Sequence, residues 1–424
     1  MINTDSLAAV AESQWTSAFL RPRYDAYGFA ALPRLIPALL GAAPLDGDAA
    51  ALGPLAETYD QVILLLLDGF GWSYYARWAD SFPFLSRFAR DGVVAQITSQ
   101  FPSTTATHLT CIHSGLPVGQ SGVYEWFYYE PQLDAMIAPL LFSFAGDVQR
   151  DTLRRTRIAP AALYPTDTLY RRLQARGVAA HIYQHQDYTP TTYSEVLFAG
   201  AHVVPYKTLP EALTALDLTL QAATGPAYHF LYCDPIDSMS HRYGPASPQV
   251  AAEATALWTV LEALLTPLLA RLHGRVLLLL TADHGAVAVD PATTVYLNRQ
   301  VPELLPLLRT NRKGYALAPA GSARDMFLYV VPARLEEAEA RLRERLAGRA
   351  EVHRVAELVA AGFFGPAPSA AFLGRVGDLV ILPYAGESVW WYERGRFTQP
   401  FYGHHGGLTP AEMEIPLLAL SVGD

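Results

Sequence analysis

Five short segments spread along the chain carry side chains that a pair of divalent metal ions could bind. The residues concerned are Asp68, Thr105, Asp237 with His241, Asp283 with His284, and His405. Mixed carboxylate and imidazole ligands suit zinc best, with manganese and iron as alternatives. Three of the segments follow apolar runs typical of buried strands, so their acidic groups fall where a sheet meets solvent. The pattern predicts a metal-dependent hydrolase.

The spacing within two of these segments favours shared coordination. Asp237 and His241 are four residues apart, so on a helix they project from one face and can bind one cation. Asp283 and His284 are adjacent and follow an apolar run, so they can reach toward two different ions. Each segment taken singly also fits an ordinary turn, a helix cap or a surface loop. It is the five segments together that indicate chemistry.

A threonine at a predicted helix start is the candidate nucleophile. Residues 102–105, PSTT, open a stretch with helical periodicity that continues to Ile112. Serine and threonine are ordinary N-caps in such places. The free N–H groups and the helix dipole would also favour a phosphate there, and a neighbouring metal would lower the pKa of a hydroxyl. Because Thr104 adjoins Thr105, either threonine could be the nucleophile.

Composition narrows the class of protein. The chain has 424 residues, a formal net charge of -9, 51% hydrophobic residues and 17% charged residues. These values predict a globular protein and argue against a nucleic-acid-coating role. The only cysteines, Cys111 and Cys233, exclude a disulfide framework and favour a reducing compartment. There is no secretory signal pattern and no run approaching the roughly 18–20 apolar residues of a membrane span, so we expect a cytoplasmic protein.

Apolar strands alternate with amphipathic helices, which is the pattern of a mainly parallel sheet covered on both faces. The expected strands are 62–67, 93–98, 178–183, 229–233 and 276–281, and the main expected helices are 167–176, 209–220 and 249–272. The pattern of apolar and charged residues changes near residue 300. Beyond this point we expect a charged helix at 333–346 and strands at 326–331, 351–355 and 378–382. We predict a three-layer α/β/α core, residues 1–299 and 373–424, with an inserted small α+β cap, residues 300–372.

The order of the five segments resembles the alkaline phosphatase superfamily, and more narrowly its nucleotide pyrophosphatase/phosphodiesterase branch, which uses a threonine nucleophile. The pattern is Asp, Thr at a helix start, Asp-x-x-x-His, Asp-His-Gly and then His, and it runs from Asp68 to His405. The resemblance implies an alkaline phosphatase-like fold. It also implies hydrolysis of a phosphodiester or nucleotide pyrophosphate through a phospho-threonine intermediate.

The same resemblance implies two zinc sites. One would use Asp237, His241 and His405, and the family's His-Gly-Gly pattern selects His405 over its neighbour. The other site would use Asp68, Asp283 and His284, and the nucleophile, Thr105, would bridge to it.

Three further residues are candidate substrate contacts. His108 stands where relatives place an asparagine that holds a phosphate oxygen. Tyr124 and Trp126 belong to an aromatic stretch that could stack a nucleobase or pack in the core. The alternatives are another hydrolase of the superfamily, either a phosphomonoesterase or a phosphonoacetate hydrolase-like enzyme, or a non-catalytic metal- or nucleotide-binding relative.

Overall fold

A seven-stranded sheet forms the centre of the computed structural model, which describes residues 1–423. The strand order is β2-β17-β9-β1-β8-β6-β7. The strands are β1 (Gln61–Leu67), β2 (Val93–Thr98), β6 (Ala179–His185), β7 (His202–Tyr206), β8 (Ala227–Cys233), β9 (Val276–Thr281) and β17 (Glu414–Val422). The pairings of β1, β6, β7, β8 and β9 with one another are parallel, and β17 runs antiparallel to β2 and β9. The predicted mainly parallel sheet is confirmed.

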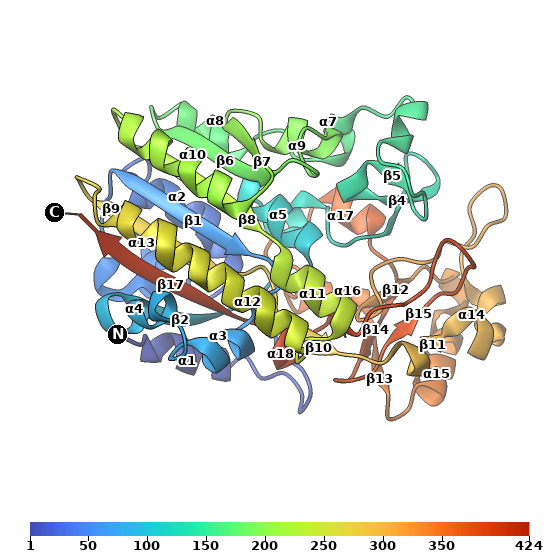
Figure 1. Ribbon diagram of the computed structural model, residues 1–424. Coiled ribbons are helices and arrows are strands. Elements are labelled where there is room, and N and C mark those ends of the chain that lie inside the picture. Colours follow the sequence, from blue (N-terminus) through green and yellow to red (C-terminus); the bar gives the residue numbers. More distant parts are fainter. Residues whose placement is uncertain (424) are drawn as a thin grey trace.

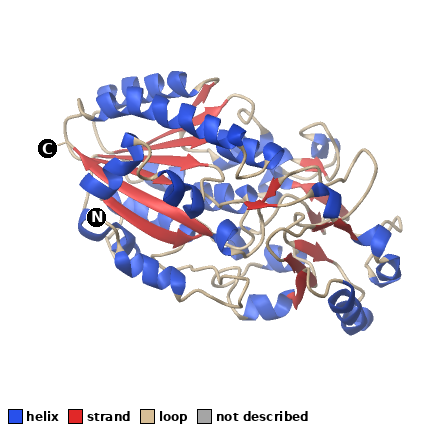
Figure 2. Ribbon diagram, turned by 60° about the horizontal axis from the view of Figure 1, so that its bottom comes forward, coloured by secondary structure: helices blue, strands red, loops and turns tan. Residues whose placement is uncertain are grey.

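The sheet lies between helices, which explains its apolar strands. β1, β8 and β9 are buried along their whole length, as a strand covered on both faces requires. Figure 1 shows α10 (Leu209–Ala222) and α12 (Pro248–Val260) crossing one face of the sheet, with α2 (Leu32–Leu39) and α5 (Thr105–Ser114) behind it. Figure 2 shows the same layering, with the large sheet between helices. The three-layer α/β/α core predicted from the sequence is therefore present.

The remaining helices connect and cover these layers. They are α1 (Thr4–Ala11), α3 (Trp72–Trp78), α4 (Pro83–Asp91), α6 (Val118–Ser121), α7 (Pro160–Leu163), α8 (Leu169–Gln174), α9 (Thr192–Leu197), α11 (Pro235–Tyr243), α13 (Thr266–Leu269), α14 (Leu297–Gln300), α15 (Leu335–Arg345), α16 (Val355–Ala360), α17 (Ala370–Arg375) and α18 (Pro410–Met413). The short strands are β3 (Tyr128–Glu130), β4 (Ala135–Ala138), β5 (Ser143–Phe144), β10 (Val287–Ala288), β11 (Val295–Tyr296), β12 (Met326–Leu328), β13 (Ala350–Arg354), β14 (Leu379–Pro383), β15 (Val389–Trp390) and β16 (Gly403–His404).

Three elements of the core differ from the expectation, because neither β7 nor β17 is among the expected strands and the helix expected over 249–272 is interrupted. β17 is an apolar run that the sequence analysis does not assign to a strand, and its Pro416 weakens the strand signal because proline has no N–H to donate. The helix expected over 249–272 changes to a π-helical turn at Leu261–Leu265 before continuing as α13. Pro267 near the start of α13 cannot donate into an α-helical ladder, which accounts for the break.

This helical segment also bears on the expected absence of a membrane span. Pro248–Leu269 is long and apolar enough to cross a membrane by length and composition, with a mean hydropathy of 1.3. Its inner side, including Trp258 and Leu265, is buried in the main apolar core. A buried core helix can have the same length and composition, so the expected absence of a membrane span stays a prediction.

A smaller sheet and a second apolar cluster lie beside the core. The order of the small sheet is β12-β14-β13, with both pairings antiparallel. The second cluster runs from Val295 to Trp390 and includes residues of α15. The small sheet therefore uses a central strand, β14, that lies beyond the predicted insertion at 300–372. The domain boundaries themselves stay a prediction.

One buried ion pair fastens the segment before β12 to the core. Arg324 and Glu412 are both 0% exposed, and the guanidinium makes two parallel hydrogen bonds of 3.0 Å to the carboxylate. The Glu412 carboxylate also accepts the N–H of Gly407 at 3.0 Å and the hydroxyl of Thr409 at 2.6 Å. This carboxylate therefore connects three parts of the chain, which are the segment before β12, helix α18 and the loop that follows His405.

Replacing Glu412 tests this junction. Glu412→Gln leaves the Arg324 guanidinium buried without a counter-charge, and breaking such a pair typically costs about 3–5 kcal/mol. We expect the free energy of unfolding in urea to fall by that amount. Glu337→Gln, which removes the same charge from ion pairs with Arg334 and Arg341 at the surface, should leave the free energy of unfolding unchanged within about 1 kcal/mol. Equal effects of the two substitutions would contradict the proposed importance of the buried pair.

Candidate metal centre and active site

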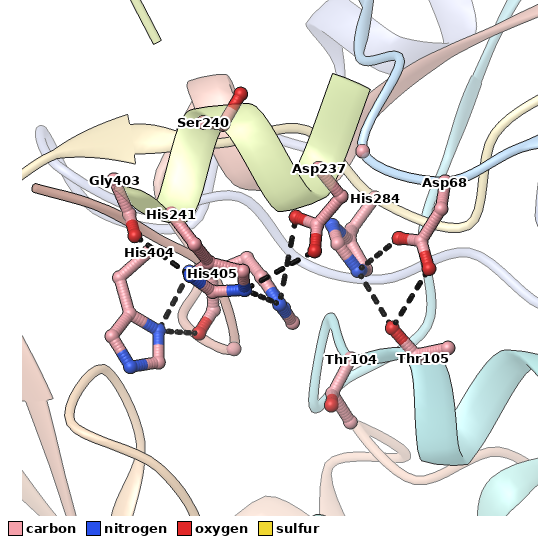
Figure 3. Close-up of polar contacts among 12 residues, drawn as sticks. Asp68, Thr104, Thr105, Asp237, Ser240, His241, His284, Gly403, His404 and His405 are labelled. Carbon is pink, nitrogen blue, oxygen red and sulfur yellow. Dashed lines mark hydrogen bonds and ion pairs between the residues drawn. The ribbon is translucent and has the colours of Figure 1, made fainter. Parts of the chain in front are cut away.

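The five predicted segments converge at one edge of the sheet. Asp68 follows β1, Asp283 follows β9, and Asp237 lies in the first turn of α11, just after β8. β1 pairs in parallel with both β8 and β9, so the carboxyl ends of all three strands meet at this edge. Thr105 begins α5, and His405 directly follows β16. Figure 3 shows side chains from these elements pointing toward one another.

Asp68, Asp283 and His284 form one potential ligand group. The Nε2 atom of His284 lies 3.3 Å from Asp68 Oδ1 and 3.4 Å from Asp283 Oδ2. The three side chains are almost completely buried. One ligand atom from each residue can be chosen so that all lie within 4.8 Å of one another.

Asp237, His241 and His405 form a second group with the same compactness. His241 Nε2 lies 3.2 Å from Asp237 Oδ2 and 3.2 Å from His405 Nε2. The other oxygen of Asp237 is 3.9 Å from His405 Nε2. The two groups are neighbours, because the rings of His284 and His405 stack with their centroids 3.6 Å apart.

Backbone carbonyls orient all three imidazoles in the same way. His241 Nδ1 donates to Gly403 O at 2.9 Å, His284 Nδ1 to Gly285 O at 3.0 Å, and His405 Nδ1 to Ser103 O at 3.0 Å. A proton on Nδ1 leaves the lone pair of each ring on Nε2, the atom that faces the aspartates. A carbonyl accepting from the far nitrogen is the usual way in which proteins orient a histidine that binds metal.

The aspartates leave one oxygen each without a protein partner. Asp68 Oδ1, Asp237 Oδ1 and Asp283 Oδ2 are buried and accept no hydrogen bond from the described residues. An unpartnered buried carboxylate oxygen is costly. Together with three imidazole lone pairs, these oxygens make donor sets that fit two divalent cations.

The electrostatics of the two groups differ. Burial, reinforced by the neighbouring carboxylates, raises the pKa of Asp68, and burial raises the pKa of Asp283 to about 7. For Asp237, burial also raises the pKa, but the charge and hydrogen bond of His241 outweigh it and hold the pKa at about 2. Asp237 is therefore stabilised by His241 when that imidazole is protonated on both nitrogens, whereas Asp68 and Asp283 lie beside His284, whose pKa is lowered by burial.

The hydroxyl of Thr105 lies at the first group. Thr105 Oγ1 is 3.4 Å from Asp68 Oδ2 and 3.3 Å from His284 Nε2. Thr104 is the N-cap of α5, and Figure 3 shows its side chain directed away from these ligands. Of the two threonines left open by the sequence, the geometry places the hydroxyl of Thr105 at this group. The structure also shows a contact that the sequence pattern does not indicate. The hydroxyl of Tyr232, near the end of β8, donates a hydrogen bond to Asp68 Oδ2.

A cavity of about 510 Å³ opens onto the two groups, and Asp68, Thr105, Asp237, His241 and His405 line it. Of the three predicted substrate contacts, Trp126 lines this cavity and is 38% exposed. Tyr124 does not line it. Its ring is fully buried and stacks on Tyr128, and its hydroxyl hydrogen-bonds that of Tyr329 at 3.2 Å. The predicted contact between Tyr124 and substrate is therefore wrong, because the side chain belongs to the core behind the cavity.

His108 also points into the protein. Its Nδ1 donates to Thr104 O at 2.8 Å, and its Nε2 accepts the N–H of Gln100 at 2.8 Å. Burial lowers the pKa of this imidazole to about 3, so the ring is neutral. Because both nitrogens are engaged, His108 does not replace an asparagine as a phosphate ligand. It fixes instead the turn that leads into α5.

The fold and this centre define a mixed α/β protein with a candidate metal site at the strand ends. The model of the type I phosphodiesterase / nucleotide pyrophosphatase family matches residues 62–408. The chain belongs to this family, a branch of the alkaline phosphatase superfamily.

Among curated proteins, the chain is similar to a venom phosphodiesterase of Naja atra, with 27% identity over 248 residues, and to venom phosphodiesterase CdcPDE of Crotalus durissus collilineatus, with 25% identity over 244 residues. Each match covers 55% of this chain and 27% of the relative's own length.

Two solved structures share the fold. One is murine ectonucleotide pyrophosphatase / phosphodiesterase 5, an inactive variant in complex with AMP, with a TM-score of 0.63, 18% identity, and coverage of 85% of this chain and 88% of that one. The other is phosphonoacetate hydrolase from Sinorhizobium meliloti 1021 in complex with phosphonoacetate, with a TM-score of 0.61, 18% identity, and coverage of 85% and 90%.

Asp283→Asn tests the electrostatics of the first group. Asp283 Oδ1 accepts the N–H groups of Gly69 and His284, and an asparagine oxygen can keep both bonds. Because the folded pKa is raised, the stability contributed by the carboxyl is full below its ordinary pKa and is lost as the pH rises through about 7. In chelator-treated protein we therefore expect the variant to raise Tm at pH 8 by at least about 2 °C, and by less at pH 5.

Zinc should reverse the sign of this effect. With zinc added, Asp283→Asn should weaken zinc binding by more than about tenfold, because an anionic ligand is lost. Thermal melts at both pH values and calorimetric zinc titrations provide the measurements. A variant that destabilises the chelated protein at pH 8 would contradict the account.

Proposed function

We propose that the protein is a metal-dependent phosphodiesterase or nucleotide pyrophosphatase that works through a covalent phospho-threonine intermediate. The observation that carries the proposal is the Thr105 hydroxyl, which lies within 3.4 Å of Asp68 and His284 at the start of a helix. Family membership over residues 62–408 supports it. The proposed substrate is a small phosphodiester or a nucleotide, and the proposed location is the cytoplasm.

Two divalent cations, with zinc the best match to these ligands, would be held by Asp68, Asp283 and His284 and by Asp237, His241 and His405. When bound, they would supply positive charge that lowers the pKa of the Thr105 hydroxyl and neutralises the phosphoryl oxygens. The carbonyls of Gly285, Gly403 and Ser103 keep the three imidazoles in the tautomer that such ions need.

The side chains of the protein position the reacting groups. Tyr232 donates to Asp68 Oδ2 and so fixes the carboxylate beside Thr105. The first N–H groups of α5 have no partners within the helix, and with the helix dipole they favour a phosphate at its N-terminus. The Thr105 hydroxyl releases its proton to solvent, its Oγ1 attacks the phosphorus in line, and the ester or anhydride oxygen leaves with the bonding electron pair. Water then attacks the same phosphorus, the bond from phosphorus to Thr105 Oγ1 breaks, and a proton returns to this oxygen.

The nucleophile is tested by Thr105→Ala. We expect the turnover of bis(p-nitrophenyl) phosphate to fall about 10³-fold or more, with the zinc content unchanged. Thr105→Ser should keep measurable activity, because it retains a hydroxyl. Thr104→Ala should stay within about tenfold of the wild type, since its hydroxyl does not contact either ligand group. Full activity of Thr105→Ala with metal bound would remove the nucleophile from the proposal.

The preference for a diester is tested separately. The cavity has an apolar wall that includes Trp126, Phe127 and Trp390, which suits a second, flat substituent on phosphorus. We expect kcat/KM for bis(p-nitrophenyl) phosphate to exceed that for p-nitrophenyl phosphate. A much better monoester substrate would favour a phosphomonoesterase. Hydrolysis of phosphonoacetate instead would favour the activity named for the structure from Sinorhizobium meliloti 1021.

A further inference from the structure

The lining of the cavity includes two polar residues that the proposed phosphodiesterase chemistry does not use. They are Gln184, near the end of β6, and Asp234, which directly follows β8. β6 and β8 pair in parallel, so their carboxyl ends lie at the same edge of the sheet. This is also the edge that carries the candidate metal centre.

Gln184 lies close to a side chain that contacts the candidate nucleophile's surroundings. Tyr183 of β6 pairs with Leu231 of β8, and paired strands run about 4.8 Å apart. The next residue on each strand, Gln184 and Tyr232 respectively, therefore lies beside the other, and both line the cavity. The hydroxyl of Tyr232 donates to Asp68 Oδ2, within the first ligand group.

Asp234 lies one helical turn from Asp237 of the second ligand group. It is the N-cap residue of α11, yet its side chain makes no capping hydrogen bond. An aspartate in this position ordinarily accepts one of the free N–H groups of the helix. Here Oδ2 accepts the hydroxyls of Tyr188 at 2.7 Å and Ser238 at 3.4 Å instead. Among residues 1–423 no group donates to Oδ1, so this oxygen is available to a ligand in the cavity.

The Gln184 carboxamide is a second, independent sign of a ligand. The residue is 3% exposed, and its Oε1 atom has no hydrogen-bond partner among the described residues. Leaving a buried acceptor unpaired costs free energy. Because Oε1 can only accept, the missing partner is a hydrogen-bond donor.

Two acceptors that face one cavity define the chemistry of the ligand. The oxygens of a phosphodiester cannot satisfy them, because they carry no proton to donate. A hydroxyl can donate to the oxygen of Gln184 or Asp234 and can also accept the carboxamide N–H. An ammonium group would also donate. However, the guanidinium carbon of Arg150 lies 5.8 Å from the centroid of the Tyr188 ring, so a positive charge already lies near the carboxylate that Tyr188 binds. This favours a neutral donor.

We propose that Gln184 and Asp234 form a subsite for hydroxyl groups of the alcohol esterified to phosphorus, so that the enzyme prefers phosphodiesters of a polyol to those of a plain alkyl alcohol. The inference rests on the proposed function and names its substrate class. A site built to bind a substrate hydroxyl discriminates against an analogue that lacks it, because its buried polar groups are then left unpaired. Glycerol and ribose both provide such neighbouring hydroxyls.

Two esters that react at the same phosphorus test the subsite. One is the p-nitrophenyl ester of glycerol 3-phosphate, and the other is p-nitrophenyl propyl phosphate, which lacks both hydroxyls. In each, Thr105 Oγ1 attacks the phosphorus and p-nitrophenolate leaves with the bonding electron pair. We expect kcat/KM for the glyceryl ester to be about tenfold higher or more. Gln184→Leu and Asp234→Ala should each reduce this preference about fivefold, and Gln184→Leu should leave kcat/KM for the propyl ester within about twofold.

Thermal melts separate recognition from a structural role. Gln184→Leu replaces an unpartnered buried carboxamide by an apolar side chain of similar size, so Tm should not fall. Asp187→Ala is the matched control for Asp234→Ala. Asp187 is an exposed residue of the loop after β6 that does not line the cavity, so its loss should leave the preference for the glyceryl ester unchanged.

The source of the hydroxyls is identified with a second pair, the p-nitrophenyl esters of AMP and of 2′,3′-dideoxyadenosine 5′-phosphate. A preference that Gln184→Leu reduces in the glyceryl pair assigns the subsite to a small polyol, and one reduced in the nucleoside pair assigns it to ribose. Wild-type protein without a preference in either pair, or preferences that survive Gln184→Leu, would overturn the subsite with the proposed function intact. Wild-type protein that hydrolyses none of the four esters would overturn the proposed function and the subsite together.

Discussion

Burying three carboxylates at one edge of a sheet is the constraint on which the rest of the structure depends. Parallel pairing of β1 with β8 and β9 brings Asp68, Asp237 and Asp283 together, and each keeps one oxygen without a protein partner. Such a concentration of charge is unfavourable unless positive charge compensates it. Histidines that are oriented by backbone carbonyls and the N-terminus of α5 lie next to these carboxylates. The buried Arg324–Glu412 pair secures the loop that follows His405.

The cavity beside these carboxylates is where the proposed substrate would be selected. The ligand groups provide the same surroundings for the phosphorus of any phosphate ester. The walls carry side chains of different kinds, including the aromatic rings of Phe127 and Trp390 and the polar groups of Arg150 and Gln184. We therefore expect selection among substrates to depend on side chains outside the two proposed ligand groups.

Much of the fold and of the centre could be predicted from the sequence, because both depend on local patterns. The aliphatic runs of β1 and β9 and the acidic residues that follow them mark the strand ends, and the prediction from 276 to 281 agrees with β9 residue for residue. β17 could not be predicted in this way. Its place between β2 and β9 depends on pairing partners far away in the sequence, and Pro416 weakens its local signal.

Side-chain direction accounts for the other differences. His108 and Tyr124 occupy positions near the candidate nucleophile, but no sequence pattern shows that His108 bonds Thr104 and Gln100 or that Tyr124 stacks on Tyr128. The most direct test of the central claim is anomalous diffraction at the zinc edge from crystals grown with zinc. We expect two peaks, one at Asp68, Asp283 and His284 and one at Asp237, His241 and His405. A single peak elsewhere, or none, would contradict it.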